Sequence, residues 1–307
     1  MPLSPPVPTL APTLEQLIPG ALLHLPGIGP VREQRLRDAG LDSWAAIQST
    51  ASWPLAETLH APICAVIAQN QHDLECDRLL PLCQTLRPID HWRILAEHFP
   101  RAAWFDIETT GLDRDSAIAM IACYHQGELH YFYEHENLDD FLELLAEIKL
   151  LVSFNGASFD VPRVLDYFHI PELPCAHLDL RWLCYHQAHR GGLKAIARTM
   201  GIHRPEDIES LAGDDAIRLW KAWRRTSDPA FKTLLTRYCA ADVVLLPLVT
   251  ECALREKEIF LECLAAPDLW SLLPAHAPVP EFHEEYPSAA SSLSVTASRR
   301  SRLKFFR

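Results

Sequence analysis

The chain has 307 residues, of which 49% are hydrophobic and 22% are charged, as is ordinary for a globular protein that holds a full core. The formal net charge of −12 at pH 7 argues against a strongly basic coat, so any affinity for nucleic acid must come from local features. No apolar run approaches the ~20 residues of a membrane span, and the first residues lack the blocks of a secretory signal. We therefore expect no membrane contact and a cytoplasmic location.

The nine cysteines are scattered, and no Cys-x-x-Cys pair occurs among them. An odd number without a framework favours reduced thiols over a disulfide scaffold. His177 and His186 lie near Cys175 and Cys184, but these residues lack the paired spacing of zinc ligands, so we expect no structural metal there.

The beginning of the chain divides into two parts. Residues 1–13 are proline-rich and are interpreted as a flexible lead-in. Residues 14–95 have helical apolar spacing and predict a small all-α domain. Within it, Leu25-Pro26-Gly27-Ile28-Gly29-Pro30 separates two stretches of helical spacing, and its glycines suit a tight turn between helices.

This segment resembles the helix-hairpin-helix family of DNA-binding motifs. The resemblance implies that the backbone amides of Gly27, Ile28 and Gly29 hold a nucleic-acid phosphate at a helix start, with Arg32 adding charge nearby. Such binding would not depend on base sequence. The alternative is a helical hairpin used only for packing.

Residues 101–265 alternate between strand and helix signals, which predicts an α/β domain. The predicted elements are strands at 102–108, 118–124 and 128–133, a helix at 138–148, and a strand at 150–154. Gln126-Gly127 supplies the turn between the second and third strands. Three hairpin-like strands, then a helix and a strand, is the order expected of a ribonuclease-H-like sheet.

Asp106 and Glu108 are the first candidate site residues. They lie two apart in the first predicted strand, so they share one face, while Phe105 and Ile107 point into a core. Carboxylates that repel each other suit a hard divalent cation such as Mg²⁺ or Mn²⁺. A solvated strand end is the alternative when this pair is considered alone.

Two later segments carry further candidates. Asp160 follows a strand and a glycine turn, which places it at the carboxyl edge of the sheet, although in isolation it would be a helix N-cap. Tyr238 and Asp242 share one face of a helix predicted from about 229 to beyond 251. That pair, too, would be structural if it stood alone.

Together, Phe-Asp-Ile-Glu-Thr-Thr-Gly-Leu, Asn-Gly-Ala-Ser-Phe-Asp and Tyr-x-x-x-Asp occur in the order of the DEDD 3′→5′ exonuclease superfamily, which the chain resembles. The tyrosine marks the DEDDy branch. The segment Gly191-Gly192-Leu193-Lys194-Ala195-Ile196-Ala197-Arg198 resembles the YprB-type ribonuclease-H-like subfamily of bacterial proteins. The resemblance covers residues 101–255, about half of the chain.

The resemblance implies phosphodiester hydrolysis at a site with two divalent ions, Mg²⁺ or Mn²⁺. Four acids would hold the ions, namely Asp106, Glu108, Asp160 and Asp242. Tyr238 would orient the attacking water, because a phenol with a pKa of about 10 is mostly neutral at pH 7. Contacts with the nucleic acid are implied for Thr109, Thr110 and Asn155.

The expected fold is thus α/β, a ribonuclease-H-like mixed sheet flanked by helices and preceded by a small all-α, helix-hairpin-helix-like domain. The expected function is a metal-dependent 3′→5′ exonuclease that hydrolyses single-stranded nucleic acid, with DNA favoured over RNA. The alternatives are a nucleic-acid-binding adaptor with a silent nuclease fold and an RNA-trimming exoribonuclease.

Several other residues are assigned simpler roles. Asp179 is expected to cap a helix, and Trp220 and Trp223 to be core residues. The cationic residues Lys194, Arg198 and Arg204 either touch substrate phosphates or lie on a solvated surface. Residues 267–307 are expected to be a disordered tail with a basic tip, which contacts nucleic acid or a protein partner, or is inert.

Overall fold

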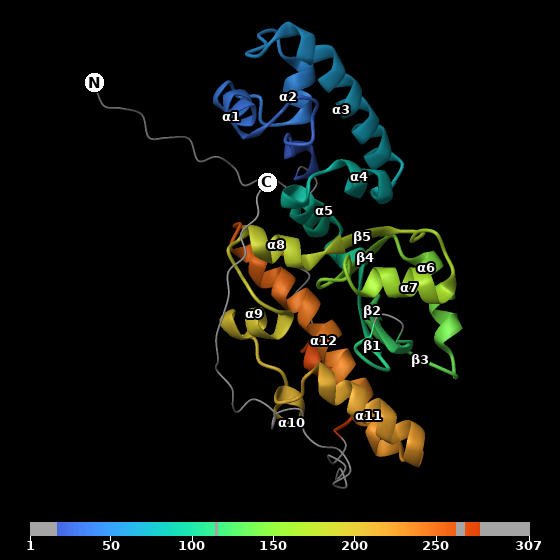
Figure 1. The fold of residues 1–307 in the computed structure, drawn as a ribbon. Helices are drawn as coiled ribbons and strands as arrows, with labels where there is room; N and C mark the ends of the chain where they lie inside the picture. Colours follow the sequence, from blue (N-terminus) through green and yellow to red (C-terminus); the bar gives the residue numbers. More distant parts are fainter. Residues whose placement is uncertain (1–16, 114–115, 262–267, 277–307) are drawn as a thin grey trace, which may run out of the picture.

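The computed structural model describes residues 17–113, 116–261 and 268–276. A helical N-terminal region is followed by an α/β domain (Figure 1). The N-terminal elements are η2 (Ile18–Gly20), α1 (Pro30–Asp38), α2 (Trp44–Ser49), η3 (Glu57–Leu59), α3 (His60–Glu75), α4 (Leu79–Thr85), η4 (Pro88–Asp90), α5 (His91–His98) and η5 (Phe99–Arg101). The expected lead-in, 1–13, lies outside the described residues.

The N-terminal region has its own apolar centre around Trp44, which is fully buried. The Trp44 indole donates a hydrogen bond to the Ala21 carbonyl at 2.7 Å, so its polar atom is satisfied in the core.

Only one of the two helices expected around the turn at Gly27 is present in the part of the chain that the structure describes. Before the turn at Gly27, the described residues 17–29 contain only the short 3₁₀ turn η2, and one helix, α1, follows. The prediction of helical structure on both sides of the turn is therefore wrong.

The α/β domain is built on a five-stranded sheet with the order β3-β2-β1-β4-β5. Its strands are β1 (Ala102–Thr109), β2 (Ile118–His125), β3 (Glu128–Tyr133), β4 (Leu150–Ser153) and β5 (Ala176–Asp179). β1 pairs antiparallel with β2 and parallel with β4, while β2–β3 is antiparallel and β4–β5 parallel. The mixed sheet confirms the predicted fold class.

The helices of this domain cover both faces of the sheet (Figure 1). They are η6 (Leu138–Asp140), α6 (Phe141–Glu147), α7 (Asp160–Phe168), α8 (Leu180–His186), α9 (Leu193–Thr199), α10 (Glu206–Glu209), α11 (Gly213–Thr226) and α12 (Pro229–Arg255). On one face, Phe105 and Ile107 of β1 pack with Phe141 of α6. On the other face, Trp104 belongs to the core that includes α12. This alternation along β1 sets the direction of every side chain discussed below.

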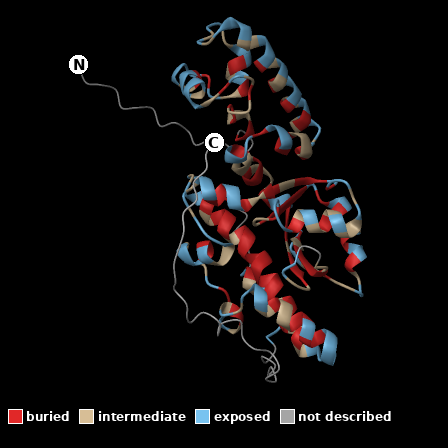
Figure 2. Cartoon of the chain, viewed as in Figure 1, coloured by how far each residue is buried: buried red, intermediate tan, exposed pale blue. Residues whose placement is uncertain are grey.

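α12 is the central helix of the domain, and Figure 2 shows it buried along most of its length. By length and composition alone it is long and apolar enough to cross a membrane, but 83% of its apolar window is buried inside the fold. Its apolar character is therefore explained by packing against the sheet and against α11 and α9.

The segment expected to be a disordered tail begins with ordered structure. η8 (Leu269–Leu272) is a 3₁₀ helix, and Leu269 and Leu273 are buried against the main core. The carbonyl of Pro274 accepts a hydrogen bond from Arg237 of α12. The expectation of disorder from 267 is thus wrong for these described residues, because their leucines pack against the domain. Residues 277–307, with the basic tip, lie outside the described residues.

His177 of β5 gives the fold a testable dependence on pH. Burial lowers the pKa of His177 from 6.5 to about 4, and its Nε2 lies 2.8 Å from Ser153 Oγ of β4. The unfolded chain binds a proton below pH 6.5, but the folded chain does not bind it until about pH 4. Such a histidine therefore removes about 1.4 kcal/mol of stability for each pH unit within that window as the pH falls.

We expect His177→Gln to reduce the loss of unfolding free energy between these two pH values, measured by urea unfolding at a series of pH values. The matched control is His203→Gln, which makes the same substitution at an exposed position. An unchanged slope in His177→Gln would show that His177 titrates normally in the folded protein.

Candidate active site

The end of β1 carries two of the predicted acids. Asp106 and Glu108 follow Trp104 on the face of the sheet that α12 covers, as the alternation predicts. The pairing with β2 shifts register between Glu108 and Thr109, which marks a bulge where the strand leaves the sheet. Both acids are therefore held on a buried strand at the point where the regular pairing ends.

Asp160 reaches the same strand from α7. It is only 3% exposed, and its Oδ1 accepts a hydrogen bond from the backbone amide of Ile107 at 3.2 Å. Gly156 makes this approach possible, since a Cβ there would lie 1.9 Å from Ser153 Oγ and 3.2 Å from Asp160 Oδ2. The N-cap position of α7 belongs to Phe159, so the alternative role of Asp160 as a helix cap is wrong.

α12 carries the remaining two predicted residues, Tyr238 and Asp242, and places them over the end of β1. Tyr238 is 1% exposed and Asp242 is 7% exposed, so both side chains face into the domain. Between them, the Sγ of Cys239 lies 3.7 Å from Asp106 Oδ2 and donates to it. Because Cys239 touches β1 directly, the helix turn that contains Tyr238 and Asp242 lies over the two strand acids.

The four acids influence one another electrostatically. Burial raises the pKa of Asp106 well above its usual range, and the charges of Asp160, Glu108 and Asp242 raise it further. Burial, followed by the charge of Asp242, likewise raises the pKa of Glu108. Burial raises the pKa of Asp160 to about 7. Without a cation, the site is thus a cluster of desolvated carboxylates that repel one another.

Asp242 differs from the other acids because two cationic side chains already pair with it. Its Oδ2 lies 2.8 Å from Lys194 Nζ of α9, and its Oδ1 accepts a hydrogen bond from Arg204 Nη1 at 3.1 Å. The Lys194 ammonium also donates to the hydroxyl of Tyr238. Two of the three cations that the sequence left undecided between substrate and surface therefore belong to the acid cluster.

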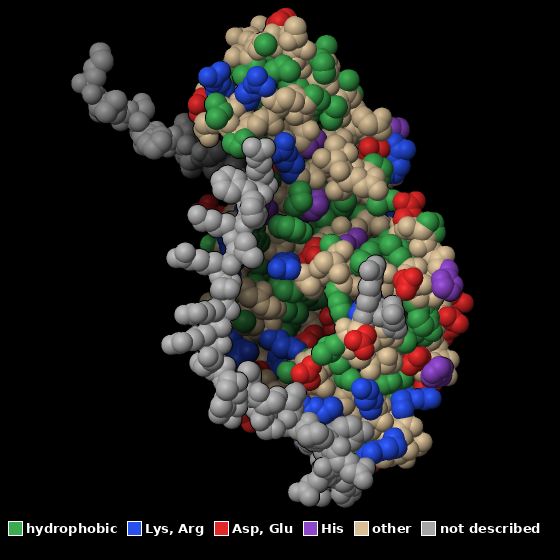
Figure 3. All heavy atoms as spheres, viewed as in Figure 1, with side chains coloured by type: hydrophobic (Ala, Val, Ile, Leu, Met, Phe, Trp, Pro, Cys, Tyr) green, Lys and Arg blue, Asp and Glu red, His purple; other side chains and the backbone are tan. Residues whose placement is uncertain are grey.

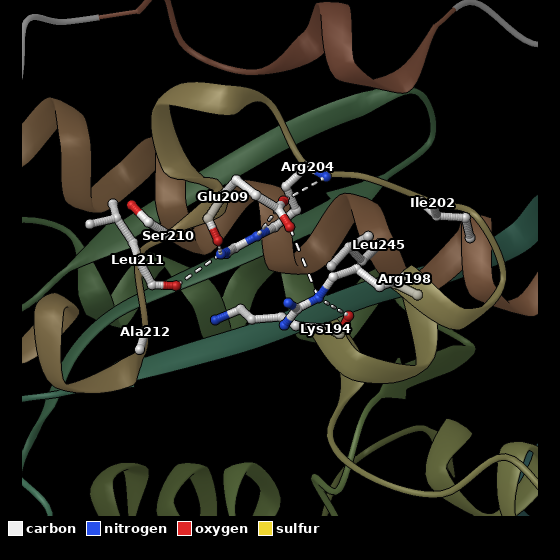
Figure 4. Close-up of a pocket in the computed structure, with 10 residues that line it drawn as sticks. Lys194, Arg198, Ile202, Arg204, Glu209, Ser210, Leu211, Ala212 and Leu245 are labelled. Atoms are coloured by element: carbon white, nitrogen blue, oxygen red, sulfur yellow. Dashed lines mark hydrogen bonds and ion pairs between the residues drawn. The ribbon is translucent and has the colours of Figure 1, made fainter.

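A cavity of about 260 Å³ opens beside this pair and is lined by Lys194, Arg198 and Arg204. Figure 4 shows the Arg204 guanidinium directed at the carbonyl of Leu211, and Arg198 beside Glu209. Arg204 is buried and bonded on several sides, so it is a fixed positive charge next to Asp242. The cavity consequently offers a cationic wall at the edge of the carboxylate cluster.

Tyr238 is held as a neutral phenol. Burial raises its pKa, and the charge of Asp242 raises it further, followed by the charges of the β1 acids. A phenol in this state can donate or accept a hydrogen bond, but it cannot serve as a base near neutral pH. Its Lys194 partner fixes the position of the hydroxyl oxygen.

The donor set fits a hard divalent cation. Ligand atoms of Asp106, Glu108 and Cys239 lie within 4.8 Å of one another, and Asp160 and Asp242 act electrostatically on the same carboxylates. Burial raises the pKa of the Cys239 thiol, so this group stays protonated and supports Asp106 as a donor. The ligands available are therefore carboxylate oxygens, which suit Mg²⁺ or Mn²⁺.

The residues predicted to contact the terminal nucleotide lie around this cluster but have partners of their own. Thr109 Oγ1 donates to the Gly111 carbonyl at 2.7 Å, and the Thr110 amide donates to Ala117. Asn155 Oδ1 accepts from Arg181. Their side chains shape the loops beside the acids, and their role in substrate binding stays a prediction.

The predicted phosphate-binding residues lie in the N-terminal region, apart from the acid cluster (Figure 1). The Ile28 amide already donates to the Leu25 carbonyl at 3.0 Å. Arg32 Nη1 donates to the carbonyl of Gly27 at 2.6 Å, which shields the turn. Gly29 precedes α1 and has open space around it. Because the Ile28 amide and Arg32 already have partners, fewer groups of the turn are available to bind an anion than the sequence predicted.

Simpler assignments are confirmed. The carboxylate of Asp179 accepts from the backbone amide of Arg181 at the start of α8, which makes it a helix cap. Trp220 and Trp223 are buried core residues. Cys239 and the pairing of Arg204 with Asp242 were missed, because no spacing rule connects residues that meet only when α12 and the preceding segment pack together.

Comparison with known proteins agrees with this geometry. Residues 103–254 match the family model of the RNase_H superfamily, so this part of the chain is an RNase H-like domain. The domain class supports a nuclease-type hydrolase that acts on nucleic acid and uses divalent metal.

A solved structure that the chain resembles is the family B DNA polymerase of the hyperthermophilic archaeon Pyrobaculum calidifontis. The likeness has 18% sequence identity and a TM-score of 0.39, and it covers 51% of this chain and 24% of the polymerase chain. No curated protein matches the sequence.

Because the acids repel one another, removing the charge of one of them should stabilise the metal-free protein. We expect Asp106→Asn to raise the unfolding free energy of the metal-free protein at pH 8 by at least about 1.4 kcal/mol, because it removes a desolvated charge. The folded-state pKa of Asp106 is raised, so the penalty of its charge grows as the pH rises and the gain should shrink near pH 5.

The same variant should lose most of the increase in melting temperature that Mn²⁺ gives the unaltered protein, measured by calorimetry. Asp139→Asn, at an exposed position of η6, is the matched control. Destabilisation of metal-free Asp106→Asn at pH 8 would contradict the carboxylate cluster.

Proposed function

We propose that the chain is a metal-dependent 3′→5′ exonuclease that hydrolyses single-stranded nucleic acid, with DNA as the favoured polymer. The observation that carries this proposal is the convergence of Asp106, Glu108, Asp160 and Asp242, from three separate segments, beside a buried Tyr238. A purely structural cluster of this kind would destabilise the fold, since no lone buried carboxylate improves packing.

Asp106, Glu108, Asp160 and Asp242 would hold the divalent ions. When bound, such ions lower the pKa of the attacking water and stabilise the leaving 3′ oxygen. The protein's own contribution is to keep the acids fixed on a buried strand, so that no rearrangement is needed when the substrate arrives. Tyr238, held by Lys194, would orient the water through its neutral hydroxyl.

Lys194 and Arg204 supply the positive charge that a carboxylate cluster lacks. Lys194 acts on Asp106, Glu108 and Asp242 together, and Arg204 holds Asp242 from the other side. In the proposed reaction both cations hold the Asp242 carboxylate in place. The cationic cavity beside them suits the negative charge of a phosphate.

The pairing of Asp242 also favours a second candidate function, a nucleic-acid-binding adaptor with a silent nuclease fold. Lys194 and Arg204 already neutralise this acid, so the site could be stable without the second ion of a two-metal mechanism. An RNA-trimming exoribonuclease remains the third candidate, because the acid cluster itself does not distinguish the two sugars. The sequence resemblance of the turn before α1 to DNA-binding hairpins is the reason for favouring DNA, although the Ile28 amide and Arg32 of that turn already have partners.

Incubation with end-labelled single- and double-stranded DNA and RNA, with and without Mn²⁺, tests the three candidates together. We expect a ladder of products that shortens from the 3′ end of single strands and depends on the metal. Asp106→Asn should lower the rate at least about 100-fold, because it removes charge from the metal ligands.

Salt-dependent retention on a filter without products from any substrate would favour the adaptor, and trimming confined to RNA would favour the exoribonuclease. Asp139→Asn again serves as the control and should trim at the unaltered rate.

The orienting role of Tyr238 has its own test. Tyr238→Phe keeps the ring in the core but removes the hydroxyl, so we expect kcat to fall by up to about 100-fold with little change in KM. Because the phenol is neutral, the pH profile of the residual activity should keep its shape up to about pH 9. Loss of an ionisation from the profile in Tyr238→Phe would mean that the phenol acts as a base instead.

A further inference from the structure

The exposed side of α8 carries aromatic side chains that the proposed chemistry does not use. Leu183 and Cys184 are buried beneath the helix, while Trp182 is 44% exposed and Tyr185 is 47% exposed. The ring centroids of Trp182 and Tyr185 lie 5.9 Å apart at an angle of 76°, and the His186 ring stacks on Trp182 at 6.4 Å. Large aromatic side chains on a surface, held close to one another, are typical of a binding site.

A groove lies beside this helix. It encloses about 520 Å³, within the range of ligand sites, and is formed by the loop after β4, by α8, and by the loop before α9. Phe154 and Asn155 line one side, Arg181 and Tyr185 the second, and Arg190 and Gly192 the third. In Figure 3, Lys, Arg and His side chains with hydrophobic ones between them lie where Figure 1 places α8 and α9.

The charge of the groove is opposite to that of the whole chain. Among the described residues that line it are Arg181, Arg190 and His189, and none of the lining residues is acidic, although the chain has a net charge of −12. Arg190 lies over the Tyr185 ring, with its Cζ 3.9 Å from the ring centroid. At the rim, His189 pairs with Glu256 at 2.9 Å. A polyanion with flat apolar groups therefore complements this surface.

Along the chain, the groove adjoins segments that carry the candidate active site. Its lining residue Leu193 directly precedes Lys194, which contacts both Tyr238 and Asp242. On the opposite side, Asn155 belongs to the loop that leads into Asp160. These links along the chain motivate a path for a single strand from the acids to α8.

We propose that this groove holds the nucleotides that precede the 3′-terminal one in a single strand, with phosphates paired with Arg181 and Arg190 and bases stacked on Tyr185 and on Trp182, which lies beside the groove next to Tyr185. The inference rests on the proposed function and extends it, because it assigns the upstream part of the substrate to a surface outside the acid cluster. Stacking on aromatic side chains accepts every base, so the groove selects single strands without reading their sequence.

The experiment uses the full chain and 5′-fluorescein-labelled oligothymidylate and oligouridylate of about 12 nucleotides, within the span of single-strand sites. Binding is measured by anisotropy without metal, and trimming is measured with Mn²⁺. Trp182→Ala and Tyr185→Ala should each weaken binding and lower kcat/KM by on the order of tenfold, while hydrolysis of a dinucleotide stays within about twofold.

Tyr185→Phe keeps the aromatic face and should bind like the unaltered protein, which separates stacking from a hydrogen bond of the hydroxyl. Lys221→Ala is the charge control, since Lys221 is exposed on α11, near the opposite end of α12 from α8 (Figure 1). Unchanged melting temperatures will show that all four variants fold.

The outcomes separate this proposal from the function on which it rests. Normal trimming and binding by Trp182→Ala and Tyr185→Ala would overturn the groove and leave the exonuclease intact. Weakened binding in these variants, in a protein that hydrolyses no substrate, would support the groove and overturn the exonuclease. If the unaltered protein binds neither oligonucleotide, the groove is not a nucleic-acid site, and a protein partner becomes its occupant.

Discussion

The structure depends on a conflict between burial and charge at the end of β1. The strand must be apolar on both faces to lie at the centre of the sheet, yet Asp106 and Glu108 occupy two of its positions beneath α12. These carboxylates are largely withdrawn from water, so their charge has to be balanced by other groups. Lys194, Arg204 and the thiol of Cys239 are the groups that the chain itself brings, and the remaining imbalance favours a divalent cation.

The two cations and the acids lie on different elements, and these elements hold them in place in different ways. The acids lie on the sheet and on two helices packed directly against it, so their positions are fixed by the core. Lys194 lies on the short helix α9, and Arg204 follows it in an irregular segment that is anchored to the carbonyl groups at 209 and 211. The acids are therefore positioned by the sheet and the helices packed on it, and the cations by α9 and by the hydrogen bonds of the buried Arg204.

The sequence predicted the sheet because local alternation determines it, and it predicted the four acids through the resemblance of three motifs to those of known exonucleases. Alternation along 102–109 places Asp106 and Glu108 on one face, and the spacing of Tyr238 and Asp242 places them on one helical face. The helix expected before Gly27 failed because residues 21–29 satisfy their backbone through tight turns, as the bond from Ile28 to Leu25 shows. The partners of Asp242 and the aromatic side of α8 could not be predicted, since both depend on how distant segments pack.

The contribution of α12 to the site has a consequence for the timing of synthesis. Asp106 and Glu108 leave the ribosome long before Tyr238 and Asp242, and only the docking of this last long helix covers them. A nascent chain that stops before residue 229 would thus present two hydrated, freely ionised carboxylates on an open sheet. In the proposed exonuclease, the acid cluster and the completed core would then form in one event.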